Sequence, residues 1–518
     1  MFSDLDEWCT LHVMALLDIR LPKSIANALS LPENSPKRQQ LRVLKKLLKK
    51  AKDTRFGQHY AFKSILDDKN PEIKFQQTVK AFDYSSIYAD WWNKTLAGDE
   101  DVCWPGKIKY FALSSGTSEA ASKYIPITKD LMKGNRISMI KQLLSLRNYE
   151  NIPWKSVGKG YLMLGGSTDL QQGPGYFAGD LSGITAKKAP FWFSPFYKPG
   201  KKIARTKDWN KKLEAIVEEA PNWDIGFLVG IPAWIQMCME LIIKRYNLNN
   251  IHEIWPNLAF FCHGGVAFEP YKKGFEKLLG KPLIYLETYL ASEGFIAYHD
   301  RQNHDGMKLV LNEHIFFEFV PFDEENFDNN GNIIKSPKAL FIDQVEEGKD
   351  YAILMSTSAG AWRYLIGDTI RFMNLEKSEV IITGRTKHFL SLTGEHLSVD
   401  NMNRAIQDVG EKLNITISEF TVAGIAMDRF FAHHWYIGTD DSVDKEILRK
   451  MLDDSLRELN DDYATERISV LKDVIVDILP EKTFMDFMEF KGKIGGQHKF
   501  PRVLKGEMYN DWLDFLKK

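Results

Sequence analysis

Short apolar runs alternate with helical patterns between residues 105 and 385, and this alternation indicates the fold class. Residues 127–146 and 209–220 show the helical spacing of apolar side chains. The runs that read as buried strands are IKYFAL, GYLML, IGFLVG, NLAFF, LIYLE, YAILM and EVIIT. Strands that alternate with helices are typical of mixed α/β architecture. We therefore expect one large α/β domain, with an antiparallel part around residues 312–342.

The pattern restarts after Gly384-Arg385-Thr386-Lys387. Two strand-like runs, ISEFTVAGIAM and HHWYIGT, precede a helix and a third run, ISVLKDVIVDIL. We expect the buried face of this helix to consist of Ile447, Leu448, Met451, Leu452, Leu456 and Leu459. A chain of 518 residues is too long for one core. The sequence therefore predicts two domains, residues 1–386 and a separate α+β domain at 387–518.

The charge balance gives no sign of a polyanionic partner. Lysine and arginine number 68 against 69 acidic residues, a net charge of −1. Ser35-Pro36 begins an amphipathic helix over residues 36–52, whose second face is strongly basic. We interpret this face as solvated, because the whole chain is neutral. Nucleic acid and membrane are therefore not expected as partners, and the oligomeric state is left open.

Cysteine usage and the first residues favour the cytoplasm. The four cysteines are widely spaced, as in a reducing compartment, and form no Cys-x-x-Cys pair that would hold zinc. The chain starts MFSDLDEW, acidic where a secretory signal is basic. No apolar run approaches the roughly 18 residues of a membrane span. We expect a cytoplasmic protein.

Hydroxyl side chains gather in SSGTSEAASKYIP, residues 114–126, directly after an apolar run. Backbone N–H groups and hydroxyls in a turn after a strand suit a phosphate chain, so this stretch predicts an anionic ligand. It lacks the Gly-x-x-x-x-Gly-Lys-Ser/Thr pattern, which disfavours an ordinary P-loop NTPase. Gly173-Pro-Gly175-Tyr-Phe-Ala178 matches a dinucleotide pattern, but a turn explains it better.

A hydrolase is the rival interpretation of the same stretch. Gly116-Thr-Ser118-Glu-Ala120 is close to the Gly-x-Ser-x-Gly nucleophile elbow, and His263-Gly264-Gly265 resembles a lipase oxyanion segment. A hydrolase also needs an acid and a histidine, in that order, and none of the 12 histidines is distinguished by its surroundings. We therefore rank hydrolysis below nucleotide binding.

Two further stretches carry groups that suit a nucleotide. Tyr289, Ser292 and Glu293 follow the run PLIYL and offer an aromatic face, a hydroxyl and a hard oxygen ligand. Asp368 follows Gly367 and can accept both hydroxyls of a ribose. Arg385 adds a second cation. Each residue also fits a structural role, so the combination carries more weight than any one of them.

In this order the three stretches resemble the nucleotide motifs of the Gretchen Hagen acyl-acid amido synthetases. This family lies within the acyl-adenylate-forming superfamily, which contains firefly luciferase and the acyl-CoA synthetases. The resemblance rests on Ser114-Ser-Gly-Thr-Ser118 with Lys123, Tyr289-x-x-Ser292-Glu293, Arg363-Tyr-x-x-Gly367-Asp368 and Gln497-His-Lys499-Phe-Pro501-Arg502. It implies a large N-terminal adenylate-forming domain with mixed sheets and a small mobile α+β C-terminal domain. Ala120 and Trp362 depart from the family's usual glycine and tyrosine.

The resemblance also implies roles for single residues. Tyr289 would stack on adenine, Ser292 would contact the α-phosphate, and Asp368 would bind the ribose. Glu293 would hold Mg²⁺. Lys499, with Lys493 as the fallback, would stabilise charge on the α-phosphoryl group, and Lys387 would lie at the hinge. The remaining candidates for binding ATP are Ser114, Ser115, Gly116, Thr117, Ser118, Lys123, Gly265 and Arg385.

The implied reaction uses ATP and Mg²⁺ to activate a small carboxylic acid. The acid becomes an acyl-adenylate, and an amine, typically that of an amino acid, then captures the acyl group. Two alternatives stay open. One is an acid–thiol ligase that uses coenzyme A. The other is a nucleotide- or acyl-acid-binding protein without turnover, which the departure from the family's glycine at Ala120 would allow. The sequence names neither the acid nor the acceptor.

Overall fold

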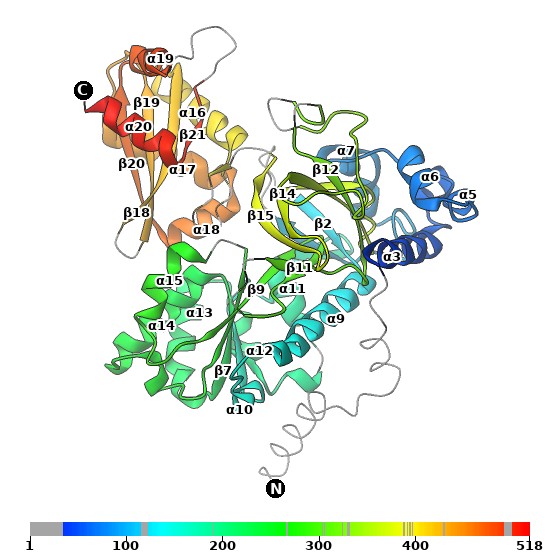
Figure 1. Cartoon of the computed structure of the whole chain (residues 1–518). Coiled ribbons are helices and arrows are strands. Elements are labelled where there is room, and N and C mark those ends of the chain that lie inside the picture. The colour runs from blue at the N-terminus through cyan, green and yellow to red at the C-terminus, as the bar shows by residue number, and fades with distance from the viewer. Residues whose placement is uncertain are drawn as a thin grey trace. The chain divides into compact units, whose positions relative to one another are not determined.

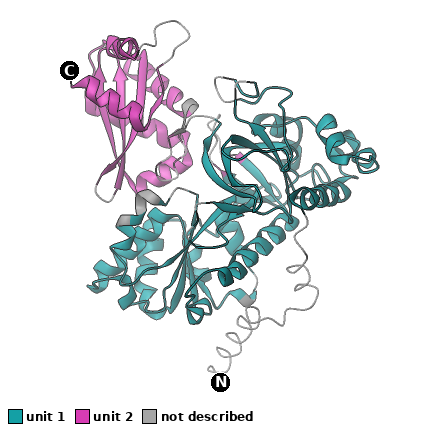
Figure 2. Ribbon diagram, viewed as in Figure 1, with its two compact units in different colours: residues 1–113, 124–386 teal, residues 114–123, 387–518 magenta. Residues whose placement is uncertain are grey.

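The computed structural model describes most of the chain beyond residue 34. The described residues are 35–114, 123–189, 191–265, 268–302, 304, 306–323, 325–328, 332–386, 389–390, 392, 395, 397–427, 430–491 and 500–517. The chain divides into two compact units, which Figure 2 colours separately. Unit 1 comprises residues 1–113 and 124–386, and unit 2 comprises residues 114–123 and 387–518.

Unit 1 is built on a large mixed sheet (Figure 1). One half, β6-β3-β7-β8-β9, is parallel, and the other half, from β9 to β12, is antiparallel. The strands, in the order of the sheet, are β12 (Ile315–Pro321), β13 (Asp350–Thr357), β14 (Tyr364–Asn374), β15 (Glu379–Arg385), β11 (Met307–Leu309), β10 (Gly294–Tyr298), β9 (Ile284–Ala291), β8 (Phe260–Gly264), β7 (Ile225–Gly230), β3 (Gly160–Met163) and β6 (Tyr197–Lys198). The expected antiparallel part around residues 312–342 is confirmed in part: β12 is antiparallel, but its partner along its whole length is β13, beyond residue 342, and Leu340 forms only a single antiparallel bridge with Phe319.

A smaller sheet of unit 1 has the order β2-β1-β5-β4. Its strands are β1 (Tyr110–Ser114), β2 (Lys123–Ile127), β4 (Gln171–Gly173) and β5 (Tyr176–Gly179). Gly173 pairs with Tyr176, so the stretch with a dinucleotide pattern is a two-residue hairpin turn, with Gly175 at φ +81°. The interpretation of that stretch as a turn is confirmed.

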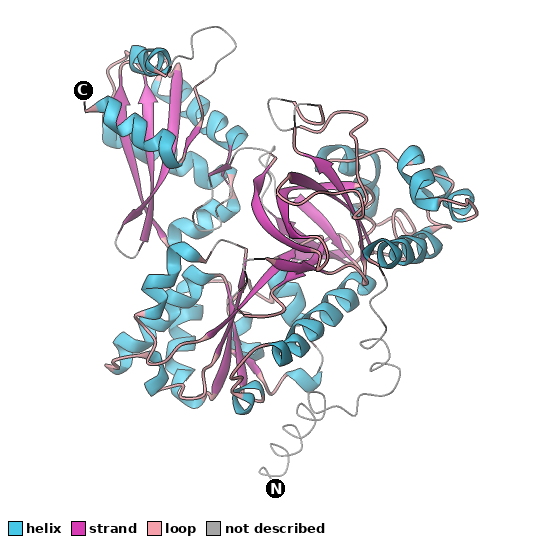
Figure 3. Cartoon of the chain, in the orientation of Figure 1, coloured by secondary structure: helices cyan, strands magenta, loops and turns pink. Residues whose placement is uncertain are grey.

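Helices flank the parallel strands (Figure 3). They include α9 (Lys129–Ser145) and α13 (Trp209–Glu219), which confirm the two helices expected from the apolar spacing. The others in unit 1 are α3 (Pro36–Ala51), α4 (Arg55–His59), α5 (Phe62–Leu66), α6 (Pro71–Thr78), α7 (Tyr84–Ile87), α8 (Asn93–Leu96), α10 (Trp154–Val157), α11 (Leu181–Lys187), α12 (Gly200–Ala204), α14 (Pro232–Tyr246) and α15 (Glu269–Glu276).

Helix α3 shows how the sequence pattern becomes structure. The Ser35 side chain accepts a hydrogen bond from the Arg38 backbone N–H, which caps the first turn, and Pro36 takes the first helical position. The apolar face, Val43, Leu44, Leu47, Leu48 and Ala51, is buried in the core of unit 1. The basic face is exposed, as expected.

Unit 2 has a four-stranded sheet, β20-β19-β18-β21, between two layers of helices. Side chains of one sheet face, including Val422 and Trp435, pack with α16 to α18, and those of the other, including Ala423 and Tyr436, pack with α19 and α20. The elements are β16 (Phe389–Leu390), β17 (Leu397–Ser398), α16 (Val399–Leu413), β18 (Glu419–Met427), β19 (Phe430–Gly438), α17 (Lys445–Leu459), α18 (Asp461–Ser469), β20 (Leu471–Leu479), α19 (Glu481–Phe490), β21 (Val503–Leu504) and α20 (Gly506–Leu516).

The predicted α+β pattern of unit 2 is confirmed, with one error within α17. Leu448, Leu452 and Leu456 are fully buried, but Ile447 is 52% exposed. Ile447 lies in the first turn of the helix, just after the N-cap Asp444, one position away from the buried stripe. Throughout the described residues of both units, no helix combines the length and apolar character that crossing a membrane requires.

Candidate functional site

Asp368 is the centre of a buried polar cluster in unit 1. The Tyr289 hydroxyl, on β9, donates to Asp368 Oδ2 at 2.6 Å. Arg385 Nε, on β15, lies 2.7 Å from Asp368 Oδ1, and the two residues are register partners in the sheet. Three residues that the sequence placed far apart are thus brought together. The contacts of Tyr289 hold Asp368 in place, and the Tyr289 side chain is 6% exposed.

Glu293 is held in a similar way by a tyrosine from the third motif. Ser292 and Glu293 form the two-residue turn between β9 and β10, where Ala291 pairs with Gly294. Glu293 is 7% exposed, and the Tyr364 side chain, at the start of β14, hydrogen-bonds to it. Each motif therefore supplies a tyrosine that fixes the carboxylate of the other motif. Tyr364 is part of the third motif, but no role for it was predicted from the sequence; the available signal was a hydroxyl group at the first position of an apolar strand.

Both tyrosines are kept neutral by their surroundings. Burial, and then the negative charge of Asp368, raise the pKa of Tyr289 well above its usual value. The pKa of Tyr364 is likewise raised well above its usual value, first by burial and then by the negative charge of Glu293. A neutral phenol can donate its proton in a hydrogen bond to a carboxylate, whereas a phenolate cannot. The cluster therefore keeps its hydrogen bonds across the physiological pH range.

Arg363 and Trp362, which precede Tyr364, have structural contacts. Arg363 Nε lies 3.1 and 3.0 Å from the two carboxylate oxygens of Glu318, and its Nη1 donates to the carbonyls of Gln76 and Val79. The Trp362 Nε1–H donates to the Cys103 carbonyl at 3.1 Å, and the indole is fully buried. The departure from the family pattern at Trp362 therefore lies in the core, where it packs against aromatic residues such as Phe62.

The remaining candidate residues are only partly described. Ser114 is the last residue of β1, and Lys123 is the first residue of β2. Gly265 follows β8 with φ +84°, a conformation that favours glycine. Ser115, Gly116, Thr117, Ser118, Ala120, Lys387, Lys493 and Lys499 lie outside the described residues.

The described residues contain no group of three or more His, Cys, Asp or Glu side chains that could hold a metal ion. A magnesium ion that accompanies a nucleotide needs less than this. It usually takes one or two carboxylates together with phosphate oxygens and water. The buried carboxylate of Glu293, at the tip of a tight turn, fits that smaller requirement.

The surroundings of His263 count against a hydrolase. Its ring packs between Phe261 and Phe268, with centroids 5.2 and 4.7 Å away. Burial, and then His299, lower the pKa of His263 to about 3. The side chain of His263, which begins the segment that resembles a lipase oxyanion segment, therefore belongs to an aromatic core, and the candidate nucleophile Ser118 lies outside the described residues.

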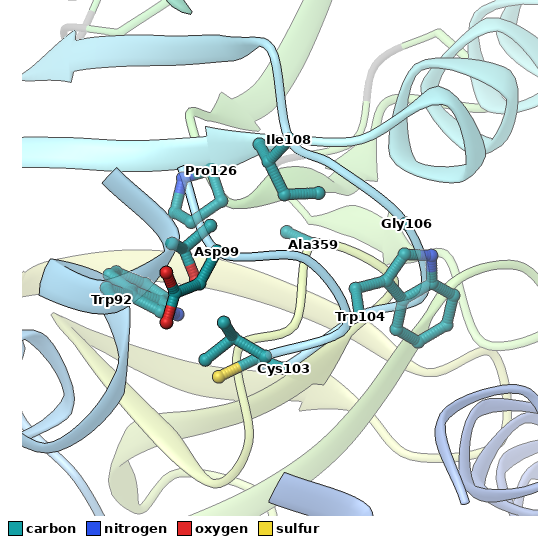
Figure 4. A pocket seen from close by; sticks show the side chains of 10 residues that line it. Trp92, Asp99, Cys103, Trp104, Gly106, Ile108, Pro126 and Ala359 are labelled. Carbon is teal, nitrogen blue, oxygen red and sulfur yellow. The ribbon is translucent and has the colours of Figure 1, made fainter. Parts of the chain in front are cut away.

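A hollow elsewhere in unit 1 is a packing feature (Figure 4). It is lined by Trp92, Trp104, Cys103, Ile108 and six neighbours and includes about 210 Å³ of space between atoms. Asp99 is the one charged residue that lines it, and no residue of the polar cluster does. Burial raises the pKa of the Cys103 thiol, which makes it a poor nucleophile.

Family models match most of the chain. The GH3 family N-terminal domain matches residues 27–217, the GH3 family central domain matches 308–380, and the GH3 family C-terminal domain matches 400–507. These matches cover more than half of the 518 residues. They also include the third motif, at Tyr364 and Asp368, within the central domain.

Similar curated proteins are plant amido synthetases. The probable indole-3-acetic acid-amido synthetase GH3.9 of Oryza sativa subsp. japonica is 22% identical over 282 residues, which are 49% of this chain and 62% of the relative. The jasmonoyl–L-amino acid synthetase GH3.5 of the same organism is 25% identical over 276 residues, which are 49% of this chain and 47% of the relative. The chain thus spans less than two thirds of the length of these relatives.

Solved structures with the same fold cover nearly the whole chain. A GH3.15 acyl acid amido synthetase has a TM-score of 0.55 at 16% identity, over 93% of each chain. A 2-hydroxyisobutyryl-CoA ligase in complex with 2-HIB-AMP and CoA has a TM-score of 0.58 at 12% identity, over 94% of this chain and 93% of that one. At these identities the likeness concerns the fold alone, and it confirms the expected large α/β domain followed by a small α+β domain.

Proposed function

The chain belongs to the GH3 (Gretchen Hagen) family, and from this we propose that it is an ATP-dependent ligase that joins a small carboxylic acid to the amine of an amino acid. The observation that carries the proposal is the pair of buried carboxylates, Asp368 and Glu293, each held by a tyrosine of the other's motif. Such fixed acceptors are what the ribose and the metal–phosphate part of a nucleotide require. The names of the plant relatives support the same reaction class.

In the proposed site Asp368 accepts hydrogen bonds from the ribose hydroxyls. Tyr289 and Arg385 each bond one of its oxygens, and a carboxylate has further lone pairs on both. Glu293 would hold Mg²⁺, which supplies positive charge beside the phosphates. Ser292 lies next to Glu293 in the turn and would contact the α-phosphate. The loop residues Ser115, Gly116, Thr117 and Ser118, with Ser114 and Lys123, would bind the phosphate chain.

The first step makes the acid reactive. A carboxylate oxygen of the acid forms a bond to the α-phosphorus of ATP, and the bond from that phosphorus to pyrophosphate breaks. Lys499 would stabilise the charge that develops on the α-phosphoryl group. The product is an acyl-adenylate and free pyrophosphate.

The second step makes the amide. The neutral amine attacks the acyl carbon, the bond from this carbon to the AMP oxygen breaks, and the amine loses a proton to water or buffer. AMP leaves with the oxygen that came from the acid. One site serves two reactions, so we propose that residues 387–518 form a mobile domain that changes position between the two steps, with a hinge at Lys387. A cytoplasmic location, where ATP and amino acids are abundant, completes the proposal.

The test is acid-dependent exchange of labelled pyrophosphate into ATP, with Mg²⁺ and a panel of aromatic, indolic, fatty and hydroxy acids. At least one acid should support exchange, and Asp368→Asn should lower its rate at least about tenfold, because a charged acceptor for the ribose is lost. Asp350→Asn is the matched control. Asp350 pairs with Arg371 in the same sheet, at 2.9 and 3.0 Å, away from the proposed nucleotide.

Other outcomes would identify the alternatives. Binding of ATP without exchange for any acid would contradict the ligase and favour a binding protein. Exchange followed by acyl transfer to coenzyme A, with no transfer to any amino acid, would identify an acid–thiol ligase instead.

A further inference from the structure

The parallel strands of unit 1 end at an edge that is rich in glycine. Strands β3, β7, β8 and β9 are neighbours and run in parallel, so their carboxyl ends lie on the same edge of the sheet. Gly165 and Gly166 follow β3, Gly230 ends β7, and Gly264 and Gly265 end or follow β8. Tyr289 of the polar cluster lies near the end of β9. Ligands of open α/β sheets bind at this edge.

A buried lysine lies at the β3 end of the same edge. Lys212, on α13, is 4% exposed, and its Nζ donates to the carbonyl of Gly165 at 3.0 Å. An ammonium group has three N–H donors, and within the described residues Lys212 makes this one hydrogen bond. Burial lowers the pKa of Lys212, while the negative charge of Asp180 acts in the opposite direction. The sequence analysis did not single out this residue.

Two tryptophans next to Lys212 carry buried donors as well. The Trp209 ring is 5.9 Å from Lys212 Nζ, and the centroids of Trp209 and Trp234 are 4.6 Å apart. The Nε1 atoms of both indoles are buried and have no hydrogen-bond partner in the described part of the chain. Trp234 lies in the first turn of α14, just after β7, and α13 and α14 lie side by side (Figure 1).

In this corner the two indole N–H groups lack an acceptor within the described residues, and the Lys212 ammonium group lies beside them. A buried donor without an acceptor is unfavourable, so a purely structural role would be served better by an apolar side chain. An ammonium group and two indole N–H groups all suit a negatively charged oxygen. The nearby charge of Asp180 disfavours a dianion such as phosphate and leaves room for a single negative charge. The flat indoles suit an aromatic or conjugated body.

We propose that Lys212, Trp209 and Trp234 form a subsite for a second carboxylate, at the far end of the acid that the enzyme activates. The inference rests on the proposed ligase function and specifies its substrate as a dicarboxylic acid. Neighbouring strands are about 4.8 Å apart, so about 14 Å separate the ends of β3 and β9. The second carboxylate thus lies at the end opposite the one that reacts with ATP.

The test compares matched acids in pyrophosphate exchange: terephthalate with benzoate, 4-carboxycinnamate with cinnamate, and azelate with nonanoate. For at least one pair, the dicarboxylate should have a kcat/KM at least about tenfold higher. Lys212→Met should abolish this preference, by lowering kcat/KM for the dicarboxylate to that of the matched monocarboxylate. Lys211→Met is the matched control, because Lys211 is the exposed neighbour on the same helix and should leave the preference intact.

A second variant and a second readout keep the result decisive. Trp234→Phe removes one N–H and retains an aromatic ring, so it should weaken dicarboxylate selectivity even if Lys212→Met fails to fold.

Calorimetric binding of the dicarboxylates without ATP does not depend on turnover. Binding that requires Lys212, without any exchange, would support the subsite and contradict the ligase. Exchange with monocarboxylates only, unchanged in Lys212→Met and Trp234→Phe, would overturn the subsite and leave the ligase standing. Absence of both binding and exchange would overturn the subsite together with the ligase.

Discussion

At the scale of single residues, the site is defined by two crossed hydrogen bonds. Tyr289 of the second motif bonds Asp368 of the third, and Tyr364 of the third motif bonds Glu293 of the second. A hydrogen bond from a neighbouring tyrosine fixes the position of a carboxylate before the ligand binds, which favours binding. The tyrosines therefore have a positioning role in addition to any contact with the nucleotide.

Tyr364→Phe should raise the KM for Mg·ATP about tenfold, because a hydrogen bond to a buried charged group is lost. The kcat at saturating ATP should change less. Tyr463→Phe is the matched control, since the Tyr463 hydroxyl donates to Asp453 at 2.8 Å in unit 2. Initial rates of exchange at varied ATP measure both variants. Equal KM values for Tyr364→Phe and the wild-type protein would show that Tyr364 does not position Glu293 for nucleotide binding.

The sequence suggested candidate site residues, but it could not predict which of them contact one another. Asp368, Arg385 and Tyr289 were identified by their position after apolar runs and by the family resemblance. Their mutual contacts depend on the register of β14 with β15, which no local pattern encodes. Lys212 was missed for a similar reason, because a lysine within a polar helical stretch is normally solvated.

At the scale of elements, unit 2 contains a buried ion-pair network that joins α17 to α18. Asp453, on α17, accepts hydrogen bonds from Arg467 Nε at 2.7 Å, Arg457 Nη2 at 3.1 Å and the Tyr463 hydroxyl. Burial alone would raise the pKa of Asp453, but the hydrogen bonds from Arg467, Arg457 and Tyr463 outweigh it and lower the pKa to about 2. The charged form of Asp453 therefore stabilises the folded state.

Asp453→Asn should lower the free energy of unfolding of unit 2 by about 2–3 kcal/mol at pH 7, because the buried guanidinium group of Arg467 and the partly exposed one of Arg457 lose their counter-charge. The pKa is lower in the folded state than in the unfolded state. The stabilisation is therefore fully present above about pH 4 and is lost as the pH falls from about 4 to 2. Urea unfolding at pH 7 and pH 3 measures this difference. If the difference in the free energy of unfolding between Asp453→Asn and the wild-type protein is as large at pH 3 as at pH 7, the stabilising role of charged Asp453 is contradicted.

Helix α3 shows why some elements are predictable. Its cap, its first-turn proline and its apolar stripe are all local signals, and the structure reproduces them. The start of β8 was predicted wrongly: the apolar run NLAFF begins before the observed strand, Phe260–Gly264. An apolar run does not show where pairing with the neighbouring strands starts.

At the scale of the whole molecule, the two compact units and the family assignment support the proposal that the chain forms an acyl-adenylate and then an amide. The sequence could predict this class of fold because its motifs occur in a fixed order along the chain. It could not predict the acid, since the residues that would bind it come from α13, α14 and the glycine edge, which only the fold brings together.

The most direct measurement uses an acid whose carboxylate is labelled with oxygen-18, chosen from those that support exchange. The protein is incubated with this acid, ATP, Mg²⁺ and amino acids, and the products are analysed by mass spectrometry. We predict an amide conjugate that retains one labelled oxygen, and one labelled oxygen in the AMP formed with it. Formation of ADP, with the label in inorganic phosphate, would contradict adenylation and indicate an acyl phosphate instead.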